Sequence, residues 1–376
     1  MKFIHLSDLH LGKRVNEFSM LEDQRFILSE IMNIIVEEAP QAVLLAGDIY
    51  DKSVPLPEAV TLFDQFVTEL RDNRIQLLLA GGNHDSQERL AFGHRLFEDA
   101  GIHIAPLFDG SLKSVVIEDE FGPVIFHLMP FMRPARLRPF FADFEPENQQ
   151  QAVDKLLSTI RTEGARHVLI AHLFVNGSLR CASEDTVGTL DGVSCESFSA
   201  FVYTALGHLH GPQQFCGGRV RYCGSPLKYS FSEAALQKSV TVVQLDGNGE
   251  ATVKERPLVP LHDMRELRGS YEELTRRESY KDTATDDYLH ITLTDEEEIF
   301  EATARLRLIY PHLMTLSYDN SRTRAEPDFS AACRAEAKTP LELFSELYKR
   351  QNGSELTKEQ SDFVTVLIRE LEEESA

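Results

Sequence analysis

The sequence predicts a layered α/β fold, followed by a smaller α/β domain and a helical tail, in a chain of 376 residues. Short apolar runs alternate with amphipathic stretches over the first two-thirds of the chain, which favours a largely parallel sheet covered by helices. Polar residues follow most of these apolar runs, as they do at the ligand-binding edge of such sheets. After Pro257 and Pro260 the composition changes, which indicates a domain boundary.

The candidate strands are short runs of aliphatic and aromatic residues. In chain order they are Lys2–Leu6, Ala42–Ala46, Ile75–Ala80, Val124–Leu128, His167–Ala171 and Tyr203–Leu206. Apolar residues recur at helical spacing in three intervening stretches, 26–39, 57–72 and 150–164. The later strand Lys238–Leu245 and a hairpin over Cys216–Cys223 suggest a second, more antiparallel sheet packed against the first.

The remainder of the chain predicts two smaller parts. The segments "DDYLHITLTD" and "HLMTLSYD" are typical of strands, and "EEEIFEATARLRLIY" between them is typical of a helix. We therefore expect three parts, over residues 1–262, 263–330 and 338–376. The second part on its own predicts only an appended α/β domain.

The third part contains two predicted helices. Thr339 and Pro340 form a cap and a first-turn proline for a helix that Gly353 would end. Thr357 and Gln360 have the spacing of a capping box and begin the second helix. The apolar stripes are Leu341, Phe344, Leu347 and Tyr348 on the first helix, and Phe363, Val364, Leu367, Ile368 and Leu371 on the second. Two such short helices cannot bury both stripes in each other, so one face should remain for a partner or for the chain's own second domain.

The composition is that of an ordinary globular protein, with 42% hydrophobic and 26% charged residues. We find no segment like a signal peptide and no apolar run near the roughly 20 residues of a membrane span, so we expect a cytoplasmic protein without membrane contact. Five cysteines without C-x-x-C spacing argue against a disulfide framework, and Cys216 and Cys223 are expected to be reduced thiols. The net charge of −22 argues against autonomous DNA binding unless metal ions, a basic stripe or a partner reverses the local field.

Side chains able to bind metals follow five of the predicted strands. They are Asp8 and His10 in "SDLH", Asp48 and Asp51 in "GDIYD", Asn83, His84 and Asp85 in "GGNHD", His172 in "AHLF", and His208 and His210 in "GHLHG". Because the carboxyl ends of parallel strands meet at one edge of a sheet, these side chains should share one crevice. Imidazole, carboxylate and amide ligands suit Mn²⁺, Fe²⁺ or Zn²⁺, and seven of them suit two ions that share a bridging carboxylate.

Each of these residues also has a purely structural explanation. A lone histidine at a strand end is more often a hydrogen-bonded polar residue than a ligand, and Gly-Asp or "GNHD" often forms a turn. The presence of candidate ligands at every major strand end favours the metal site. The remaining histidines fit no such pattern and are interpreted as structural or exposed: His5, His94, His103, His127, His167, His262, His290 and His312.

The motifs resemble, in order, those of the calcineurin-like metallophosphoesterases: Asp8-x-His10, Gly47-Asp48, Gly82-Asn83-His84-Asp85, His172 and Gly207-His208-x-His210. Three longer stretches, "HLSDLHLGK", "AGDIYDKSVPLPEAV" and "RYCGSPLKYSFSEAALQKSVTVVQLD", resemble the SbcD family of bacterial nuclease subunits within that superfamily. The resemblance covers about residues 1–320. It implies a four-layer α/β nuclease domain over 1–262, a capping domain that guides DNA over 263–330, and a helical pair over 338–376 that docks a partner.

The resemblance also implies which residues bind metal. Asp8, His10, Asp48 and His210 would hold one ion, and Asp48 would bridge to a second ion that is also held by Asn83, His172 and His208. The implied metal is Mn²⁺ at both positions. His84 would not bind metal; it would stabilise charge on the reacting phosphate or protonate the leaving group, and Asp85 would orient its imidazole.

The implied activity is manganese-dependent cleavage of double-stranded and hairpin DNA, both exonucleolytic and endonucleolytic, in DNA repair, recombination and replication. The implied partner is the ATPase SbcC, in an assembly of two SbcC and two SbcD chains whose nuclease domains form a homodimer. Lys13 and Arg14 are the best-placed cations near the site. In the capping domain the available cations are Arg305, Arg307, Arg322 and Arg324.

Two other functions stay open at this point. A stand-alone phosphodiesterase or nucleotidase acting on small molecules would suit the acidic balance of the chain. A non-catalytic docking protein would need only the fold, although a retired site has no physical reason to keep all seven ligands. A cap and a tail beyond a complete catalytic domain favour the nuclease.

Overall fold

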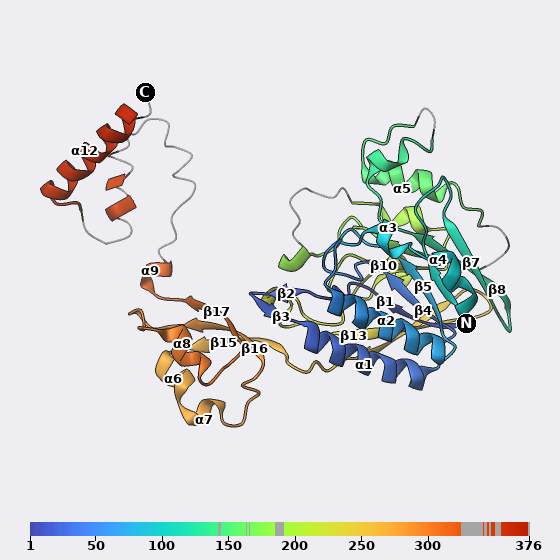
Figure 1. Cartoon of the computed structure of the whole chain (residues 1–376), viewed down its shortest axis with the longest axis horizontal. Coiled ribbons are helices and arrows are strands. Elements are labelled where there is room, and N and C mark those ends of the chain that lie inside the picture. Colours follow the sequence, from blue (N-terminus) through green and yellow to red (C-terminus); the bar gives the residue numbers. More distant parts are fainter. Residues whose placement is uncertain are drawn as a thin grey trace. The chain divides into compact units, whose positions relative to one another are not determined.

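The computed structural model describes residues 1–141, 144–162, 164, 166–184, 192–324, 341, 344–345, 347–349 and 355–374 (Figure 1). The chain divides into two compact units. The first unit is Met1–Glu266 with Asp286–Leu289, and the second is Leu267–Thr285 with His290–Ala376. This division falls near the expected boundary after residue 262, and the three domain limits themselves stay a prediction.

The first of two six-stranded sheets in unit one contains the first strand of the chain. Its order is β14 (Ala251–Pro257), β13 (Ser239–Leu245), β1 (Lys2–Leu6), β4 (Ala42–Ala46), β5 (Gln76–Ala80) and β6 (Ile102–Ile104). Strands β1, β4, β5 and β6 run parallel, whereas β13 pairs antiparallel with β1 and with β14. The predicted strands that became β1 and β4 are confirmed residue for residue.

The second sheet has the order β11 (Gln213–Phe215), β12 (Val220–Tyr222), β10 (Tyr203–Gly207), β9 (Arg166–His172), β8 (Gly122–Met129) and β7 (Lys113–Asp119). Strands β8, β9, β10 and β12 are parallel, and the hairpins β7–β8 and β11–β12 are antiparallel. The prediction that the strand over 238–245 belongs to this sheet was wrong. That strand, β13, covers the free edge of β1, where His5 lies opposite Thr241.

The two sheets face each other across an apolar core. Phe3 of β1 lies edge to face with Phe126 of β8 and Tyr203 of β10, with ring centroids 5.7 and 5.6 Å apart. Leu44 and Ile170, from the middle strands of the two sheets, are fully buried in the same cluster. Because helices cover the outer faces, unit one has the predicted four-layer α/β arrangement.

Helices α1 (Leu21–Glu38) and α2 (Pro57–Asp72) contact each other and lie against the first sheet (Figure 1). Pro57 suits the first turn of α2, where a missing N–H costs no helical hydrogen bond. Helix α5 (Gln149–Leu157) covers the second sheet and ends earlier than the apolar spacing over 150–164 suggested. The hydroxyls of Ser158 and Thr159 donate to the carbonyls of Lys155 and Leu156, which favours a turn over further helix.

The other elements of unit one are short. They are β2 (Arg14–Val15), β3 (Phe18–Ser19), α3 (Gln87–Leu90), α4 (His94–Phe97), and the 3₁₀ turns η1 (Glu98–Ala100), η2 (Pro134–Leu137), η3 (Ala182–Glu184), η4 (Cys195–Phe198), η5 (Cys216–Gly218) and η6 (Phe231–Glu233). Cys195 and Cys216 form a disulfide, with Cα atoms 6.4 Å apart, whereas Cys223 is a free, buried thiol. The expectation of a reduced Cys216 was therefore wrong, because its neighbour across the fold is Cys195 rather than Cys223.

The second unit is built on a three-stranded sheet in the order β15 (Met264–Gly269), β16 (Tyr288–Leu293) and β17 (Leu313–Tyr318). Its helices are α6 (Tyr271–Thr275), α7 (Arg277–Tyr280), α8 (Ala302–Arg307), α9 (Ser321–Arg324) and α12 (Lys358–Glu374). The strand–helix–strand pattern predicted from the sequence is present as β16, α8 and β17. Helix α8 occupies less of its stretch than expected, since it begins only after Glu301, whose φ of 51° is left-handed.

The tail is described in part. The Oγ1 of Thr357 accepts from the N–H of Gln360 at 3.3 Å, and the side chain of Gln360 accepts from the N–H of Thr357 at 2.9 Å. This reciprocal pair is the predicted capping box, and α12 begins directly after it. The predicted cap at Thr339 and Pro340, and the predicted end at Gly353, lie outside the described residues. Among the helices that the structure describes, none is long and apolar enough to cross a membrane.

Candidate metal centre

The candidate ligands meet at the carboxyl ends of β1, β4, β5, β9 and β10. Three groups of side chains have donor atoms within 4.8 Å of one another, and together they comprise Asp8, His10, Asp48, His84, His172 and His210. Asn83 and His208 adjoin these groups through the hydrogen bonds given below. All eight side chains expected at the site therefore lie together. Four of them have left-handed backbone, with φ of 54° at Asp8, 44° at His10, 51° at Asp48 and 105° at His208. Such strain outside glycine is typical of functional sites.

Asp48 lies at the centre of the cluster. Its Oδ2 atom is 3.4 Å from Nε2 of His172, 3.7 Å from Nε2 of His10 and 4.0 Å from Nε2 of His84. Burial alone would raise the pKa of Asp48, but the charge and hydrogen bond of His172 hold it below its usual range. Burial would likewise lower the pKa of His172, yet Asp48 raises it to about 9. A carboxylate kept ionised among several imidazoles suits a bridging ligand.

The remaining candidate ligands lie on either side of Asp48. On one side, Nε2 of His10 is 3.1 Å from Nε2 of His210. On the other side, Oδ1 of Asn83 is 3.0 Å from Nε2 of His172 and 3.1 Å from Nδ1 of His208. Burial and the nearby charge of His172 lower the pKa of His208 to about 3, which keeps its ring neutral. The two sides correspond to the two ligand groups that the sequence suggested.

Glycines allow the chain to approach this closely. A Cβ atom on Gly82 would lie 2.1 Å from Oδ1 of Asp48, and one on Gly47 would lie 2.4 Å from Nδ1 of His172. A Cβ atom on Gly207 would lie 1.8 Å from the carbonyl oxygen of Ala46. The glycines in "GD", "GN" and "GH" are thus required by the spacing of the strand ends.

The residues fit divalent metal ions. The Nδ1 atom of His10 is buried and has no hydrogen-bond partner among the described residues. Two imidazole nitrogens also face each other at 3.1 Å, in His10 and His210, beside the buried carboxylate of Asp8. Buried donor atoms in this number, with few protons to share, suit cations better than they suit one another.

His84 and Asp85 differ from expectation. The Nδ1 atom of His84 is 2.8 Å from the backbone oxygen of Asp51, and its ring is one-third exposed. The carboxylate of Asp85 instead accepts the backbone N–H groups of Ile49, Tyr50 and Gly82. The prediction that Asp85 orients His84 was wrong, because these three N–H groups occupy the carboxylate. Asp85 shapes the loop that carries the ligands, and burial raises its pKa to about 6.

Sequence reasoning missed the polar side chains behind the candidate ligands. Ser7 donates from Oγ to Oδ2 of Asp8 at 2.5 Å. Glu184 accepts the backbone N–H of His210, and Glu233 lies 3.2 Å from Nδ1 of the same histidine. Burial would raise the pKa of Glu233, but His210 and the charge of Lys238 lower it to about 2. The only signal was that Glu233 and Lys238 lie in the long stretch beginning "RYCGSP".

The nearby cations are engaged within the chain. The Nζ of Lys13 is 2.8 Å from Oδ1 of Asp51. The guanidinium of Arg14 donates to the backbone oxygen of Glu17. Of the cations named for the capping domain, Arg305 lies over the ring of Tyr271, and Arg307 donates to the carbonyl of Leu313. The side chains of Arg322 and Arg324 lie outside the described residues.

Comparison with known proteins agrees with this geometry. Residues 1–212 match the family described as Calcineurin-like phosphoesterase, and residues 260–352 match the family described as Type 5 capsule protein repressor C-terminal domain. The protein named as the D subunit of the nuclease SbcCD from Staphylococcus epidermidis is 31% identical over 377 residues, which cover 98% of each chain. Its namesake from Staphylococcus saprophyticus is 33% identical over 387 residues and the full length of both chains.

The phosphoesterase match spans more than half of the chain and contains every strand end that carries a candidate ligand. Members of that family use divalent metals, and the buried cluster of histidines and aspartates is a site of that kind. Both named relatives match along essentially their whole length, second unit and tail included. The chain therefore belongs to the calcineurin-like phosphoesterases, in the same family as the SbcD proteins of the bacterial nuclease SbcCD.

Proposed function

We propose that the chain is a metal-dependent DNA nuclease that cleaves double-stranded and hairpin DNA, as exonuclease and endonuclease, together with the ATPase SbcC. The observation that carries the proposal is the complete, buried cluster of eight strand-end side chains around Asp48. The names of the full-length relatives support DNA as the substrate and SbcC as the partner. We place the activity in the cytoplasm, in DNA repair, recombination and replication.

The ligands divide about Asp48. Asp8, His10 and His210 would hold one ion with Asp48, and Asn83, His172 and His208 would hold the second; Mn²⁺ is the ion we propose for both. When bound, two such ions supply Lewis-acid stabilisation of the phosphodiester and activation of a water molecule.

The chain's own residues supply the remaining steps. His84 is the candidate for the proton at the leaving oxygen, since its ring is partly exposed at the edge of the cluster and its Nδ1 faces the backbone oxygen of Asp51. That contact turns Nε2 towards the site, 4.0 Å from Oδ2 of Asp48, where a bound phosphate would lie. His84 would then donate a proton or a hydrogen bond to the departing oxygen.

The assembly is part of the proposal. Two copies of the chain would meet through the nuclease domain and combine with two SbcC chains. Phe92 and Leu96, beside helices α3 and α4, are 82% and 81% exposed and are among the most exposed apolar side chains of unit one. Apolar residues this exposed and this close in sequence favour a contact between proteins.

The decisive experiment is cleavage of linear and hairpin DNA by the purified chain with Mn²⁺, with and without SbcC. We expect cleavage that needs Mn²⁺, is stimulated by SbcC and ATP, and is lost in EDTA and in the variant Asp48→Asn. A small phosphodiester such as bis(p-nitrophenyl) phosphate is assayed in parallel. Turnover of the small ester alone would favour the small-molecule phosphodiesterase, which the net charge of −22 supports. No turnover of either substrate would favour a non-catalytic docking protein.

A further inference from the structure

His210 is held at three points that the ligand assignment does not use. Its backbone N–H donates to Oε1 of Glu184, and its carbonyl oxygen accepts from Nζ of Lys238 at 2.8 Å. Its Nδ1 lies 3.2 Å from Oε1 of Glu233. Both the backbone and the ring of this one candidate ligand are therefore fixed by charged side chains.

Lys238 joins the parts of this arrangement. Besides the carbonyl of His210, its Nζ contacts Oε2 of Glu233 at 2.6 Å and Oγ of Ser225 at 2.9 Å. Glu233 is fully buried and Lys238 is 5% exposed, so neither charge is screened by water. Ionised groups with so little exposure persist only when they are paired and hydrogen-bonded, and here each completes the bonding of the other.

Two other candidate imidazole ligands have a neutral oxygen where His210 has a carboxylate. Nδ1 of His172 faces the backbone oxygen of Ala46 at 2.9 Å. Nδ1 of His208 faces the side-chain oxygen of Asn83, itself a candidate ligand. A carboxylate on Nδ1 makes an imidazole a stronger electron donor at Nε2 than a carbonyl does, and it also fixes the tautomer.

We propose that Glu233 and Lys238 are positioning residues of the metal centre. Glu233 fixes the ring of His210 through Nδ1 and leaves Nε2 turned towards the metal, while Lys238 neutralises Glu233 and anchors the backbone of His210. The inference rests on the proposed function, because it gives His210 a metal ion to bind. It accounts for the part of the stretch beginning "RYCGSP" that the ligand set leaves unexplained.

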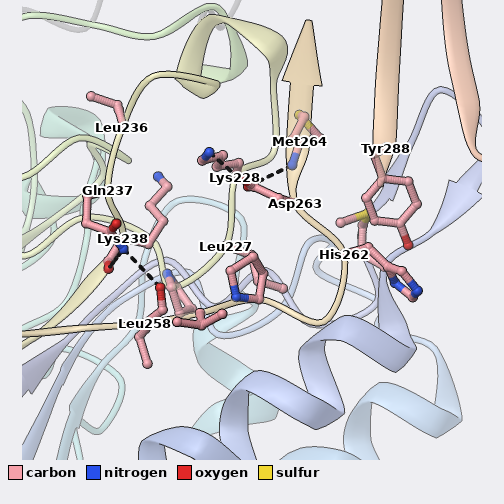
Figure 2. A pocket seen from close by; sticks show the side chains of 14 residues that line it. Leu227, Lys228, Leu236, Gln237, Lys238, Leu258, His262, Asp263, Met264 and Tyr288 are labelled. Atoms are coloured by element: carbon pink, nitrogen blue, oxygen red, sulfur yellow. Dashed lines mark hydrogen bonds and ion pairs between the residues drawn. The ribbon is translucent and has the colours of Figure 1, made fainter. Parts of the chain in front are cut away.

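The surroundings of Lys238 suit a neutral substitution. Lys238 also lines a pocket of about 190 Å³ together with apolar side chains such as Leu227, Leu258 and Met264 (Figure 2). In the double variant Glu233→Gln with Lys238→Met, an amide and a thioether replace the two charges at similar volume. This variant leaves no buried charge unpaired, which the single change Lys238→Met would do.

The test is a titration of the full chain with Mn²⁺, followed by the electron paramagnetic resonance of the free ion. We expect Glu233→Gln, alone and in the double variant, to weaken one of two ions by about 10- to 100-fold and to leave the other unchanged. In a His210→Ala background, Glu233→Gln should add less than twofold, since Glu233 acts through His210. With Co²⁺ in place of Mn²⁺, the visible absorption of one ion should shift in Glu233→Gln.

The matched control is Asp119→Asn, which removes a carboxylate from another buried ion pair, with Arg166, outside the candidate ligand cluster. It should leave both affinities for Mn²⁺ unchanged, whatever it does to stability. Urea unfolding in EDTA reports that stability for every variant. If Glu233→Gln does not fold, the same titration is made with Glu233→Asp, which keeps the charge but shortens the reach by one methylene.

The outcomes separate this inference from the function on which it rests. A wild-type chain that binds no Mn²⁺ would overturn both. Two ions bound equally well by the wild type and by Glu233→Gln, or by Glu233→Asp where that is the variant that folds, would overturn only the positioning role. So would a loss of affinity by Glu233→Gln that is just as large in the His210→Ala background.

Discussion

Asp48 and His84 are neighbours in the site but differ in exposure and in bonding. Asp48 is 2% exposed and lies within 4.0 Å of three imidazoles, whereas the ring of His84 is one-third exposed. A bridging ligand has to be buried between its ions, while a group that acts on substrate has to reach the open side. The backbone N–H of His84 donates to Oδ1 of Asp48 at 2.9 Å, so the two positions are fixed together.

This difference predicts separable effects of two substitutions. His84→Ala should lower kcat for phosphodiester cleavage by roughly 10²- to 10⁴-fold, because it removes a proton donor, while two Mn²⁺ ions still bind per chain. Asp48→Ala should lose both ions, since Asp48 is shared between them. Metal content after gel filtration, measured beside kcat, checks both expectations. A His84→Ala chain that retains fewer than two ions would make His84 a ligand, a role that its distance from Asp48 permits.

At this scale the sequence predicted the residues that touch the proposed ions, and not those behind them. Asp8, Asn83 and His208 stand directly after apolar runs, where position in the chain determines position in space. Glu184 and Glu233 lie in 3₁₀ turns far from any strand end, and only the folding of the loops brings them to His210. Asp85 shows the opposite error, since adjacency to His84 in sequence did not make them partners.

At the scale of elements, the parallel strands were predictable and their division into two sheets was not. Apolar runs such as β4 and β9 are buried along their whole length, so their hydrophobicity alone marks them as inner strands. That hydrophobicity is the same in either sheet. The choice is made by pairing, as when β13 joins β1 at the edge that no earlier strand covers.

The strand pair β7–β8 is joined to β9 by a buried ion pair that predicts a dependence on pH. Arg166 donates from Nη1 to Oδ2 of Asp119 at 3.0 Å and from Nη2 to the backbone oxygen of Gly122 at 2.8 Å. Arg166 holds the pKa of Asp119 below its usual range. A carboxylate whose pKa is lower in the folded state stabilises the fold above its unfolded pKa, near 4, and loses this contribution as the pH falls further.

Asp119→Asn should therefore lower the free energy of unfolding by about 2 kcal/mol at pH 7, because a charge-assisted hydrogen bond is lost. The difference from the wild type should stay constant down to about pH 5 and shrink below about pH 4. Urea titrations in EDTA at pH 7, 5, 4 and 3 measure it. Asp72→Asn is the control, since its pair with Arg71 is exposed and should contribute less than about 1 kcal/mol. A difference that grows at low pH would contradict the assignment.

At the scale of the whole molecule, the charge of −22 conflicts with a DNA substrate unless something else binds the phosphates. The cations nearest the site do not resolve this, because Lys13 is paired with Asp51 and Arg14 with the backbone of Glu17. Bound metal ions would reverse the field only within the site itself. Most of the binding energy for duplex DNA should then come from the partner.

We accordingly expect the isolated chain to bind duplex DNA weakly and with a shallow dependence on salt. The slope of log affinity against log salt should be no steeper than about −3, where six to ten phosphate contacts would give roughly −5 to −9. Fluorescence anisotropy between 50 and 200 mM NaCl, in Ca²⁺ to prevent cleavage, measures the slope. Adding SbcC should steepen it. Tight binding by the isolated chain with a steep slope would show that its own cations are sufficient.

The tail offers the partner an apolar face. On α12, Phe363, Val366 and Leu367 are 64%, 55% and 41% exposed, and on the preceding segment Phe344 and Leu347 are 42% and 51% exposed. The two segments contact each other, since the side chain of Gln360 donates to the hydroxyl of Tyr348 at 3.2 Å. That contact leaves these apolar side chains accessible, as expected for a helix that binds in a groove of another protein.

Deleting residues 338–376 should therefore abolish binding to SbcC and spare Mn²⁺-dependent cleavage of a small phosphodiester, because every candidate ligand lies within residues 8–210. The paired substitution Phe363→Ser with Leu367→Ser should weaken SbcC binding in the same way, whereas Asp362→Asn, on the polar side of α12, should not. Co-purification and calorimetric titration with SbcC measure the effect. If the truncated chain still bound SbcC, or if it unfolded because the apolar face covers the second unit, the tail would be a structural element rather than the docking site.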